Sequence, residues 1–318
     1  MKNIGIITTC RADYGILENL YNLLKNNKKI NTNLLVSGSH FSRKYGTTIK
    51  EIKKNNKDIS IISKNINIKN YNSIITNISK DLEKYKKSIK KLDLDFIVVL
   101  GDRFEILAPV ICSFFMNIPL IHIHGGEKTY GSNDDIIRHA VSKFSHYHFV
   151  AHKEYQKRLI QLGENKNNIF ISGGLGPDNI LKTKFLTKKE IEKKLRIKLK
   201  KNIFLVTCHP ETNKGKENKH LINEILISLK YINETTIIFT APNSDIYSEY
   251  FISKIEKFVK INKNSYFYRS LGKQLFFSLL KNSNLMIGNS SSGIIEGPTL
   301  KIPTINIGDR QKGRLFSS

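Results

Sequence analysis

Short apolar runs rich in Val and Ile alternate along this chain with longer segments in which apolar residues recur at helical spacing. This alternation predicts a doubly wound α/β architecture. Runs such as FIVVL and IFLVT are apolar without interruption, which is typical of parallel strands buried on both faces. The expected strands are Ile4–Thr8, Leu34–Ser37, Ile59–Ile62, Phe96–Leu100, Leu120–His122, Tyr147–Val150, Ile203–Cys208, Thr236–Thr240, Ser265–Tyr268, Leu285–Gly288 and Pro303–Asn306, and the clearest helices are Tyr14–Asn26, Ser73–Leu92 and Phe104–Met116.

The length of 318 residues fits two domains, at roughly 100–200 residues per domain. The segment Ile171–Leu181, ISGGLGPDNIL, concentrates three glycines and a proline before a Lys-rich helical stretch. Such a concentration is typical of a hinge or an interdomain crossing, and an ordinary strand-to-helix loop is the alternative. We therefore expect domains at residues 1–172 and 173–318.

Composition narrows the class of protein. Hydrophobic residues make up 40% of the chain and aromatic residues 9%, which excludes a disordered or fibrous protein. No apolar run approaches the roughly 18 residues of a membrane span, and the N-terminal run predicts a first strand in place of a signal segment, so we expect a cytoplasmic protein. The three cysteines form no C-x-x-C pair, which argues against a disulfide framework or a zinc site.

A formal net charge of +25 suggests nucleic acid or an anionic membrane as a partner. However, Arg supplies only nine of the 52 basic residues, whereas nucleic-acid surfaces use Arg for bidentate contacts and aromatic side chains for stacking. The Lys runs lie in amphipathic, helix-like stretches and predict solvated faces. We therefore expect neither partner, although a diffuse positive field favours small anionic substrates.

Polar residues gather at the expected carboxyl ends of the first-domain strands, where an open parallel sheet binds its ligands. Asp102 follows FIVVL and can be either a helix N-cap or a group that faces a ligand. The sequence HIHGGEK then places His122, His124 and Glu127 beside paired glycines. His122 and His124 have no third ligand at a defined spacing, so acid–base chemistry fits these residues better than zinc. Asp134 and Asp135 open the next helix, where acidic residues complement the macrodipole, and one of the two can instead point into the cleft.

In the second half, His209 follows the strand IFLVT and precedes a proline that ends it, so a structural and a functional role are both open. The strand LMIG leads into Asn-Ser-Ser-Ser-Gly and then a helix, an arrangement that gathers amides and hydroxyls for a pyrophosphate. A serine-capped helix is the alternative, but one cap needs neither three serines nor two glycines. Glu296, within that helix, is placed to accept hydrogen bonds from ribose hydroxyls. The chain lacks G-x-x-x-x-G-K-[ST], G-x-G-x-x-G and G-x-S-x-G, which argues against P-loop enzymes, dehydrogenases and α/β-hydrolases.

Together these motifs resemble the hydrolysing UDP-N-acetylglucosamine 2-epimerases of bacterial sialic-acid biosynthesis and the epimerase half of the animal bifunctional enzyme. The similarity runs from end to end and includes five of the nine arginines. The stretches that carry it are Cys10–Tyr14, Gly38–His40, Tyr45–Gly46, Gly101–Arg103, His122–Lys128, Asp134–His139, His209–Pro210, Gly288–Gly293 with Glu296, and Gly308–Arg314.

The resemblance implies a glycosyltransferase-B-like fold, with two Rossmann-like domains and the active site in the cleft between them. It implies elimination of UDP from UDP-N-acetylglucosamine and hydration to free N-acetylmannosamine, with no cofactor and no metal, in a homo-oligomer. The catalytic residues it implies are Asp102, His124, Glu127, Asp134 and His209. The substrate- and nucleotide-binding residues are Arg11, Asp13, His40, Ser290, Ser291, Gly293, Glu296 and Arg310.

Two features depart from the family pattern. Related non-sialic 2-epimerases carry a catalytic glutamate at the position of His124, so the choice between His124 and Glu127 as the group that moves the proton is open. Family members also continue beyond the position of Ser318 with a helix that braces the first domain, so we expect a truncated chain. The nucleotide sugar is open among UDP-N-acetylglucosamine, a GDP-linked version and a 4-acetamido-6-deoxy analogue. The alternatives are a glycosyltransferase of the same fold and a nucleotide-sugar-binding protein without turnover.

Overall fold

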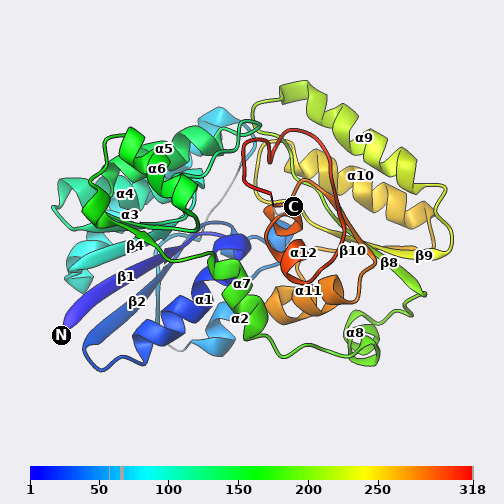
Figure 1. Ribbon diagram of the computed structural model, residues 1–318, viewed down its shortest axis with the longest axis horizontal. Helices are drawn as coiled ribbons and strands as arrows, with labels where there is room; N and C mark the ends of the chain where they lie inside the picture. The colour runs from blue at the N-terminus through cyan, green and yellow to red at the C-terminus, as the bar shows by residue number, and fades with distance from the viewer. Residues whose placement is uncertain (57, 65–67, 317–318) are drawn as a thin grey trace. The chain divides into compact units, whose positions relative to one another are not determined.

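The computed structural model describes residues 1–56, 58–64 and 68–316, so the last two residues of the expected second domain lie outside it. It consists of two compact units (Figure 1). Unit 1 contains Met1–Lys128 and Asn133–Leu175, and unit 2 contains Thr129–Ser132 and Gly176–Ser318. A four-residue segment from the first half of the chain therefore packs with the second unit. The expected boundary between residues 172 and 173 stays a prediction.

Unit 1 is built on a seven-stranded sheet in the order β3-β2-β1-β4-β5-β6-β7, whose strands all pair in parallel. The strand order reverses between β1 and β4, which is where an open doubly wound sheet binds ligands. The strands are β1 (Lys2–Thr8), β2 (Ile30–Val36), β3 (Ile59–Ile61), β4 (Phe96–Leu100), β5 (Leu120–Ile123), β6 (Tyr147–Val150) and β7 (Ile169–Ile171). The helices are α1 (Arg11–Lys25), α2 (Ile49–Asn55), α3 (Tyr71–Leu92), α4 (Leu107–Phe115), α5 (Asp134–Phe144), α6 (Lys153–Gln161) and α7 (Leu175–Leu181).

Helices cover both faces of this sheet, which explains why its central strands are apolar without alternation. Ile7 and Val99 pack in one cluster with α3, α4 and α5, while their neighbours Ile6 and Val98 pack in a second cluster with α1 and α2. Successive residues of a strand point to opposite faces, so each face requires its own apolar set. The two clusters hold the carboxyl ends of β1, β4 and β5 in a fixed register.

Unit 2 repeats the scheme with a five-stranded parallel sheet in the order β10-β9-β8-β11-β12. The helices α9 and α10 pack on one face of the sheet and α8 and α11 on the other. The strands are β8 (Asn202–Thr207), β9 (Thr235–Thr240), β10 (Ser265–Tyr268), β11 (Leu285–Gly288) and β12 (Thr304–Asn306), and the helices are α8 (Lys188–Leu195), α9 (Asn218–Leu229), α10 (Ser248–Ile261), α11 (Gly272–Lys281) and α12 (Glu296–Thr299).

The structure differs from the sequence-based expectation around residues 169–181. The strand β7 was not expected, because it has three residues and only Ile169 among them is buried. The glycine-rich stretch after it is shorter than expected, since α7 already begins at Leu175. The expected helix Phe104–Met116 is also divided into a 3₁₀ turn, Phe104–Ile106, and α4, whose Pro109 lies in the first turn, where a missing N–H is tolerated.

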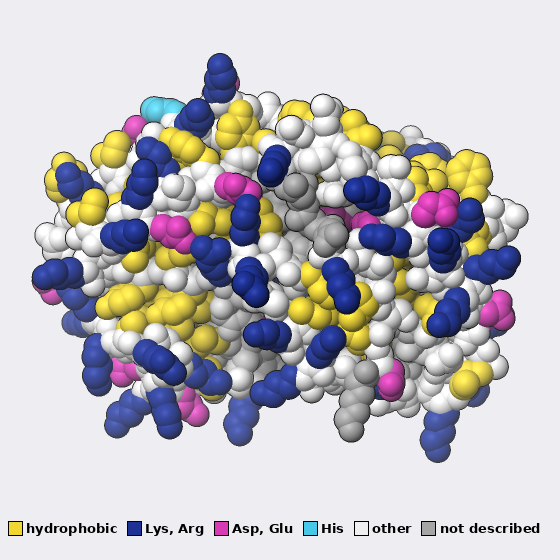
Figure 2. Space-filling model, turned by 180° about the vertical axis from the view of Figure 1, so that it is seen from behind, with side chains coloured by type: hydrophobic (Ala, Val, Ile, Leu, Met, Phe, Trp, Pro, Cys, Tyr) yellow, Lys and Arg dark blue, Asp and Glu magenta, His cyan; other side chains and the backbone are white. Residues whose placement is uncertain are grey.

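The basic side chains are dispersed over the surface. On the face shown in Figure 2, Lys and Arg side chains are scattered among uncharged and acidic ones and form no single patch. None of the helices within residues 1–56, 58–64 and 68–316 is both long and apolar enough to cross a membrane.

Gly288, the last residue of β11, provides a test of the fold. Its φ of 135° is one that side-chain-bearing residues rarely adopt, and a Cβ atom there would collide with the carbonyl oxygen of Thr207 on β8. Because neither backbone can yield without breaking the β8–β11 ladder, we expect Gly288→Ala to destabilise unit 2 by about 2 kcal/mol or more. Thermal unfolding followed by circular dichroism measures the loss.

Gly15 is the matched control. It lies inside α1, and a Cβ atom there would meet nothing within 4 Å. Gly15→Ala is expected to leave stability unchanged or raise it by about 0.5–1 kcal/mol. Equal melting temperatures for Gly288→Ala and the unsubstituted chain would contradict the described turn.

Candidate functional site

The first group of candidate residues follows the adjacent strands β4 and β5. Leu100 pairs with Ile123, and the Gly101 amide donates to the Ile123 carbonyl at 3.0 Å. Asp102 and His124 therefore begin two neighbouring loops at the same edge of the sheet. Gly101 and His124 both have positive φ values, 74° and 63°, so the chain turns sharply at both positions. For a residue other than glycine this backbone conformation is uncommon and is concentrated at functional sites.

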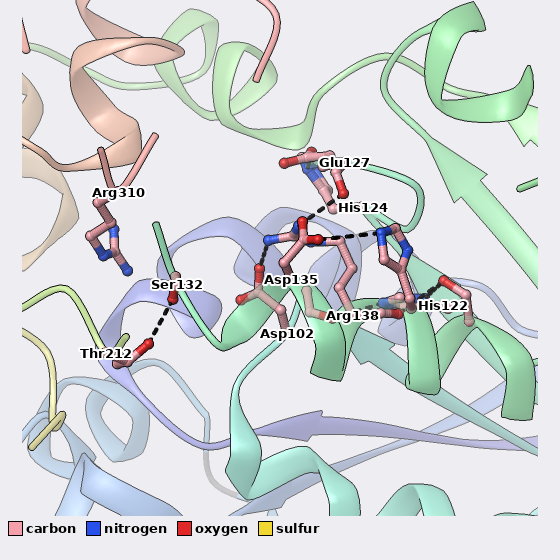
Figure 3. Close-up of polar contacts among 12 residues, drawn as sticks. Asp102, His122, His124, Glu127, Ser132, Asp135, Arg138, Thr212 and Arg310 are labelled. Carbon is pink, nitrogen blue, oxygen red and sulfur yellow. Dashed lines mark hydrogen bonds and ion pairs between the residues drawn. The ribbon is translucent and has the colours of Figure 1, made fainter. Parts of the chain in front are cut away.

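Arg138 on α5 connects these two loops (Figure 3). Its side chain is only 1% exposed, and it donates to the Asp102 carboxylate and, at 2.9 Å, to the Glu127 carbonyl. Burial lowers the pKa of Arg138, but the nearby carboxylates of Asp102, Glu127 and Asp134 outweigh burial and raise it. Asp102 is therefore the partner of a buried cation and not a helix N-cap, since Arg103 takes the cap position of the following 3₁₀ turn. Sequence reasoning did not assign Arg138 to the site, although it lies in a matched motif.

His124 and Glu127 form a buried pair within the second loop. The His124 Nδ1 and Glu127 Oε1 atoms are 2.8 Å apart. A carboxylate accepts, so Nδ1 carries a proton, and in the neutral form of such a ring the lone pair is on Nε2. Within the described part of the chain, the buried His124 Nε2 has no hydrogen-bond partner.

His122, two residues earlier on β5, has a structural position. Its Nε2–H donates to the Gly101 carbonyl at 2.8 Å, and its Nδ1 lies 3.0 Å from the Ser142 hydroxyl. Complete burial lowers the pKa of His122 to about 3, so the ring stays neutral. His122 therefore supports the turn that carries Asp102. In the described ranges no three His, Cys, Asp or Glu side chains are grouped so that they could hold a metal ion.

Asp134 and Asp135 form the first turn of α5, as expected. Asp134 is half-buried and contributes to the negative potential around Arg138. Asp135 also contacts Arg138, with its Oδ1 atom 3.4 Å from the Arg138 Nη1 atom. The structure thus gathers Asp102, His124, Glu127 and Asp134 around Arg138.

The loop after β1 is held by a separate network. The Asp13 carboxylate accepts from the Thr8 and Thr9 hydroxyls and from the amides of Thr9 and Cys10. His40 is 0% exposed, and its two ring nitrogens contact the Thr8 and Thr48 hydroxyls at 2.9 and 2.8 Å. Burial lowers the pKa of His40 to about 4. The contacts of Asp13 and His40 are those of residues that fix the loop, and a direct contact with substrate stays a prediction.

Two other residues of this loop differ in accessibility. Arg11 is half-buried in the first turn of α1. Cys10 is buried, and burial raises the pKa of its thiol. A protonated thiol is a weak nucleophile, so the structure gives no support for cysteine chemistry at this position.

In unit 2, His209 follows β8 and Asn289 follows the neighbouring strand β11. The Asn289 side chain accepts from the His209 amide at 2.7 Å and donates to the His209 carbonyl at 2.9 Å. The His209 Nδ1 atom accepts from the Asn243 amide at 3.0 Å. Sequence reasoning placed His209 at this edge but assigned no role to Asn289.

The serine-rich loop differs in part from expectation. Ser290 caps the 3₁₀ turn Ser291–Gly293 by accepting from the Ser292 amide at 3.3 Å, and α12 is only four residues long. Because the helix dipole grows with length, the loop amides and hydroxyls remain as anion donors but the expected helix contributes little. Gly293 packs against Thr304, whose Cγ2 atom would lie 2.6 Å from a Cβ. Glu296 is buried at the start of α12.

Arg310 is fixed by Glu211, a residue that sequence reasoning missed. The Glu211 Oε1 atom accepts from the amides of Asp309 and Arg310 at 2.7 and 3.1 Å. The segment Thr129–Ser132 belongs to the same unit, since the Tyr130 amide donates to the Lys312 carbonyl at 2.9 Å and Ser132 bonds Thr212 at 3.1 Å (Figure 3). The chain therefore leaves unit 1 between Glu127 and Asp134, two of the predicted catalytic residues, and returns.

The buried histidines make stability depend on pH. An unfolded His titrates near 6.5, so the unfolded state binds a proton that folded His40 accepts only near pH 4. Stability is therefore full above about pH 6.5 and is lost as the pH falls towards 4, by up to about 1.4 kcal/mol per pH unit for each such group. We expect His40→Gln to flatten this slope in urea unfolding at pH 7, 6 and 5. His220→Gln, at an exposed position on α9, is the control and should keep the wild-type slope.

The buried charge of Arg138 leads to a second prediction about stability. Arg138→Met leaves the Asp102 carboxylate without its buried partner, and we expect a stability loss of about 3–5 kcal/mol. Arg269→Met, which removes a surface pair with Glu256, should cost less than about 1 kcal/mol. The double variant Arg138→Met/Asp102→Asn should recover part of the loss in thermal unfolding. A double variant that loses the full sum of both single changes would exclude coupling between the two groups.

The chain is similar to known proteins over almost its whole length. The family model for UDP-N-acetylglucosamine 2-epimerase matches residues 22–318. The GDP/UDP-N,N'-diacetylbacillosamine 2-epimerase (hydrolyzing) of Campylobacter jejuni is 39% identical over an alignment that covers 99% of this chain and 82% of that protein. The polysialic acid biosynthesis protein P7 of Escherichia coli is also 39% identical, over 99% of this chain and 81% of its own length.

A solved structure supports the fold. The Methanocaldococcus jannaschii UDP-GlcNAc 2-epimerase, in complex with UDP-GlcNAc and UDP, aligns with a TM-score of 0.79 at 20% identity, over 96% of this chain and 84% of that one. The expected fold class, two Rossmann-like α/β units of the glycosyltransferase-B type, is confirmed. Since the family model covers nearly all of the sequence, the chain belongs to the UDP-N-acetylglucosamine 2-epimerase family.

Proposed function

We propose that this protein is a hydrolysing 2-epimerase that converts a UDP-linked 2-acetamido sugar into the free 2-epimer and UDP. Family membership and the two relatives at 39% identity support this reaction. Their names include N,N'-diacetylbacillosamine and polysialic acid, so we propose UDP-N-acetylglucosamine or a 4-acetamido-6-deoxy analogue as substrate, for synthesis of a sialic-type acid. The cytoplasmic location and the homo-oligomeric state stay predictions.

The proposed reaction has two steps. A base takes the proton from C2 of the sugar, the C2–H electron pair forms the C1=C2 bond, and the C1–O bond breaks with its electron pair moving to the oxygen of UDP. Water then adds to the 2-acetamidoglucal. Its hydroxyl joins C1, and a proton joins C2 on the face opposite to the one from which the first proton was removed. Because the C2 proton is barely acidic, stabilisation of the departing diphosphate must supply part of the driving force.

The observation that carries the proposal is that, among the residues that the structure describes, the buried Nε2 atom of His124 has no hydrogen-bond partner. Buried polar atoms almost always have a hydrogen-bond partner, and one left unsatisfied costs about 1–3 kcal/mol. The pairing of Nδ1 with Glu127 leaves the lone pair of the neutral ring on this atom. A buried lone pair that meets no group among the described residues is suited to accept a substrate proton. We therefore infer that His124 is the base at C2 and that Glu127 is a positioning residue.

The remaining predicted residues take roles that agree with their contacts. We propose that Asp102 and Asp134 contact the sugar, with Asp102 oriented by Arg138, and that Asp13 and His40 hold the loop after β1. We propose that the nucleotide contacts residues that offer side-chain donors, acceptors for the ribose hydroxyls or loop amides, and that His209 lies at the diphosphate. The residues in contact with the nucleotide are Arg11, Ser290, Ser291, Gly293, Glu296 and Arg310.

The reaction in heavy water tests this function. When UDP-N-acetylglucosamine is followed by proton NMR with no sugar acceptor present, we expect free N-acetylmannosamine with deuterium at C2, because the proton that is added comes from solvent. The diacetylbacillosamine analogue is the second substrate. A product that keeps its C2 hydrogen would exclude elimination, and transfer to an acceptor with no free sugar would favour a glycosyltransferase.

Variants separate the roles of His124 and Glu127. His124→Gln places an amide where the base was, so we expect a turnover loss of about 100-fold or more with UDP affinity kept within about threefold. Glu127→Gln retains an oxygen that accepts from Nδ1, so we expect its turnover to fall by only about 10-fold. Ser291→Ala is the opposite control and should weaken UDP binding by about 2–12-fold with little effect on turnover number. If Glu127→Gln is as inactive as His124→Gln, Glu127 is the base.

A further inference from the structure

Asn289 extends the pairing of two strands beyond the point where their backbones separate. Gly288 on β11 pairs with Thr207 on β8, and the last rung of this ladder is a 3.3 Å bond from the Asn289 amide to the Thr207 carbonyl. Beyond this rung, the Asn289 side chain continues the pairing, because it accepts from the His209 amide and donates to the His209 carbonyl. A carboxamide has the donor and acceptor of a peptide group, so it can replace a missing rung. His209 is thereby fixed although it lies outside the strand.

The ring of His209 is fixed as well. Its Nδ1 atom accepts from the Asn243 backbone amide, which can only donate. Nδ1 therefore carries no proton in this geometry, and the single proton of the neutral ring is on Nε2. This is the opposite tautomer to His124, whose Nδ1–H is held by Glu127. His209 is thus arranged to donate through Nε2–H and not to accept a proton there.

The main-chain oxygen of Asn289 holds a second donor-bearing segment. It accepts from the Gln311 side chain at 2.8 Å and from Arg310 Nη1 at 3.4 Å. Asn289 itself is 0% exposed, so these bonds are made away from water, where an unsatisfied group is costly. One buried residue therefore joins His209 to Arg310, two residues that lie about 100 positions apart in the chain.

We propose that Asn289 is a positioning residue that holds His209 as a donor through Nε2–H and holds Arg310 beside it, so that both face the oxygens of the departing nucleoside diphosphate. This inference rests on the proposed function and assigns His209 to the leaving group. No proton needs to be transferred, because a hydrogen bond from a neutral imidazole and a guanidinium contact stabilise the charge that develops as the C1–O bond breaks.

The tautomer of His209 is the direct test and does not require turnover. In ¹⁵N NMR of the full chain, we expect Nε2 of His209 to show a protonated shift and Nδ1 an unprotonated one, and the Nε2–H signal to move when UDP is added. Protonation on Nδ1, or an Nε2–H signal that UDP leaves unchanged, would overturn the assignment even if the enzyme is active. The expected tautomer and UDP response in a protein without epimerase activity would support Asn289 and His209 while contradicting the proposed reaction.

Matched variants test Asn289. Asn289→Ala removes both side-chain hydrogen bonds to His209, whereas Asn289→Asp keeps the acceptor and loses the donor to the His209 carbonyl. We expect both variants to lower kcat by about 10–100-fold, to weaken UDP binding in calorimetry and to produce a mixture of the two His209 tautomers. Asn264→Ala removes the side-chain hydrogen bonds from the Asn264 amide to the Ile232, Asn233 and Thr235 carbonyls and the one from the Ser265 hydroxyl, near the amino ends of β9 and β10. With this variant, kcat and UDP affinity should remain within about twofold. If Asn289→Asp keeps a single Nε2–H tautomer and wild-type kcat, Asn289 has no positioning role.

Two variants of His209 test whether its side chain acts as a hydrogen-bond donor at Nε2. The amide nitrogen of a glutamine reaches the place of Nε2–H, whereas that of an asparagine reaches only the place of Nδ1. We expect His209→Gln to keep UDP affinity within about threefold and His209→Asn to lose about tenfold. Equal losses for both variants would contradict a donor at Nε2.

Discussion

Burial of the Arg138 charge is the constraint on which the first half of the site depends. A guanidinium that is 1% exposed has lost nearly all its contact with water and is tolerated only with partners of opposite charge and good geometry. The partners are the Asp102 carboxylate after β4, the Glu127 carbonyl after β5 and Asp135 on the same helix as Arg138. The loops of two neighbouring strands must therefore converge on α5. The same contacts hold Asp102 in one orientation and position the backbone at Glu127, which in turn orients the ring of His124.

In the second unit, two side-chain carboxamides hold the backbone of loop residues. The Asn289 carboxamide pairs with the backbone of His209, and the Asn218 carboxamide pairs in the same way with Glu211 at 2.7 and 2.9 Å. Neutral amides cost less to bury than charges. The buried Glu211 carboxylate adds one charged group, which accepts from the Asp309 and Arg310 amides.

The hydrogen bonds of their rings distinguish His40 and His122 from His124. His40 and His122 are as buried as His124, but both of their ring nitrogens have partners and burial keeps their pKa values low. His124 has one nitrogen paired, and the other meets no partner in the part of the chain that the structure describes. A histidine motif by itself does not distinguish these cases, because all three residues lie in a parallel strand or shortly after one.

The sequence by itself determined the fold class and the position of most candidate residues. Continuous apolar runs identify buried parallel strands, and the residues after those strands, such as Asp102 and His209, must lie at the carboxyl edge of a sheet. It could not identify β7, whose three mostly exposed residues carry no periodic signal, or the shortness of α12. Only the tertiary structure shows the contacts of Arg138, Glu211 and Asn289 and the hydrogen-bond partners of His124 and His209. Those properties depend on contacts between residues far apart in the chain, and a linear pattern records the type of a side chain but not which atom of a distant segment satisfies it.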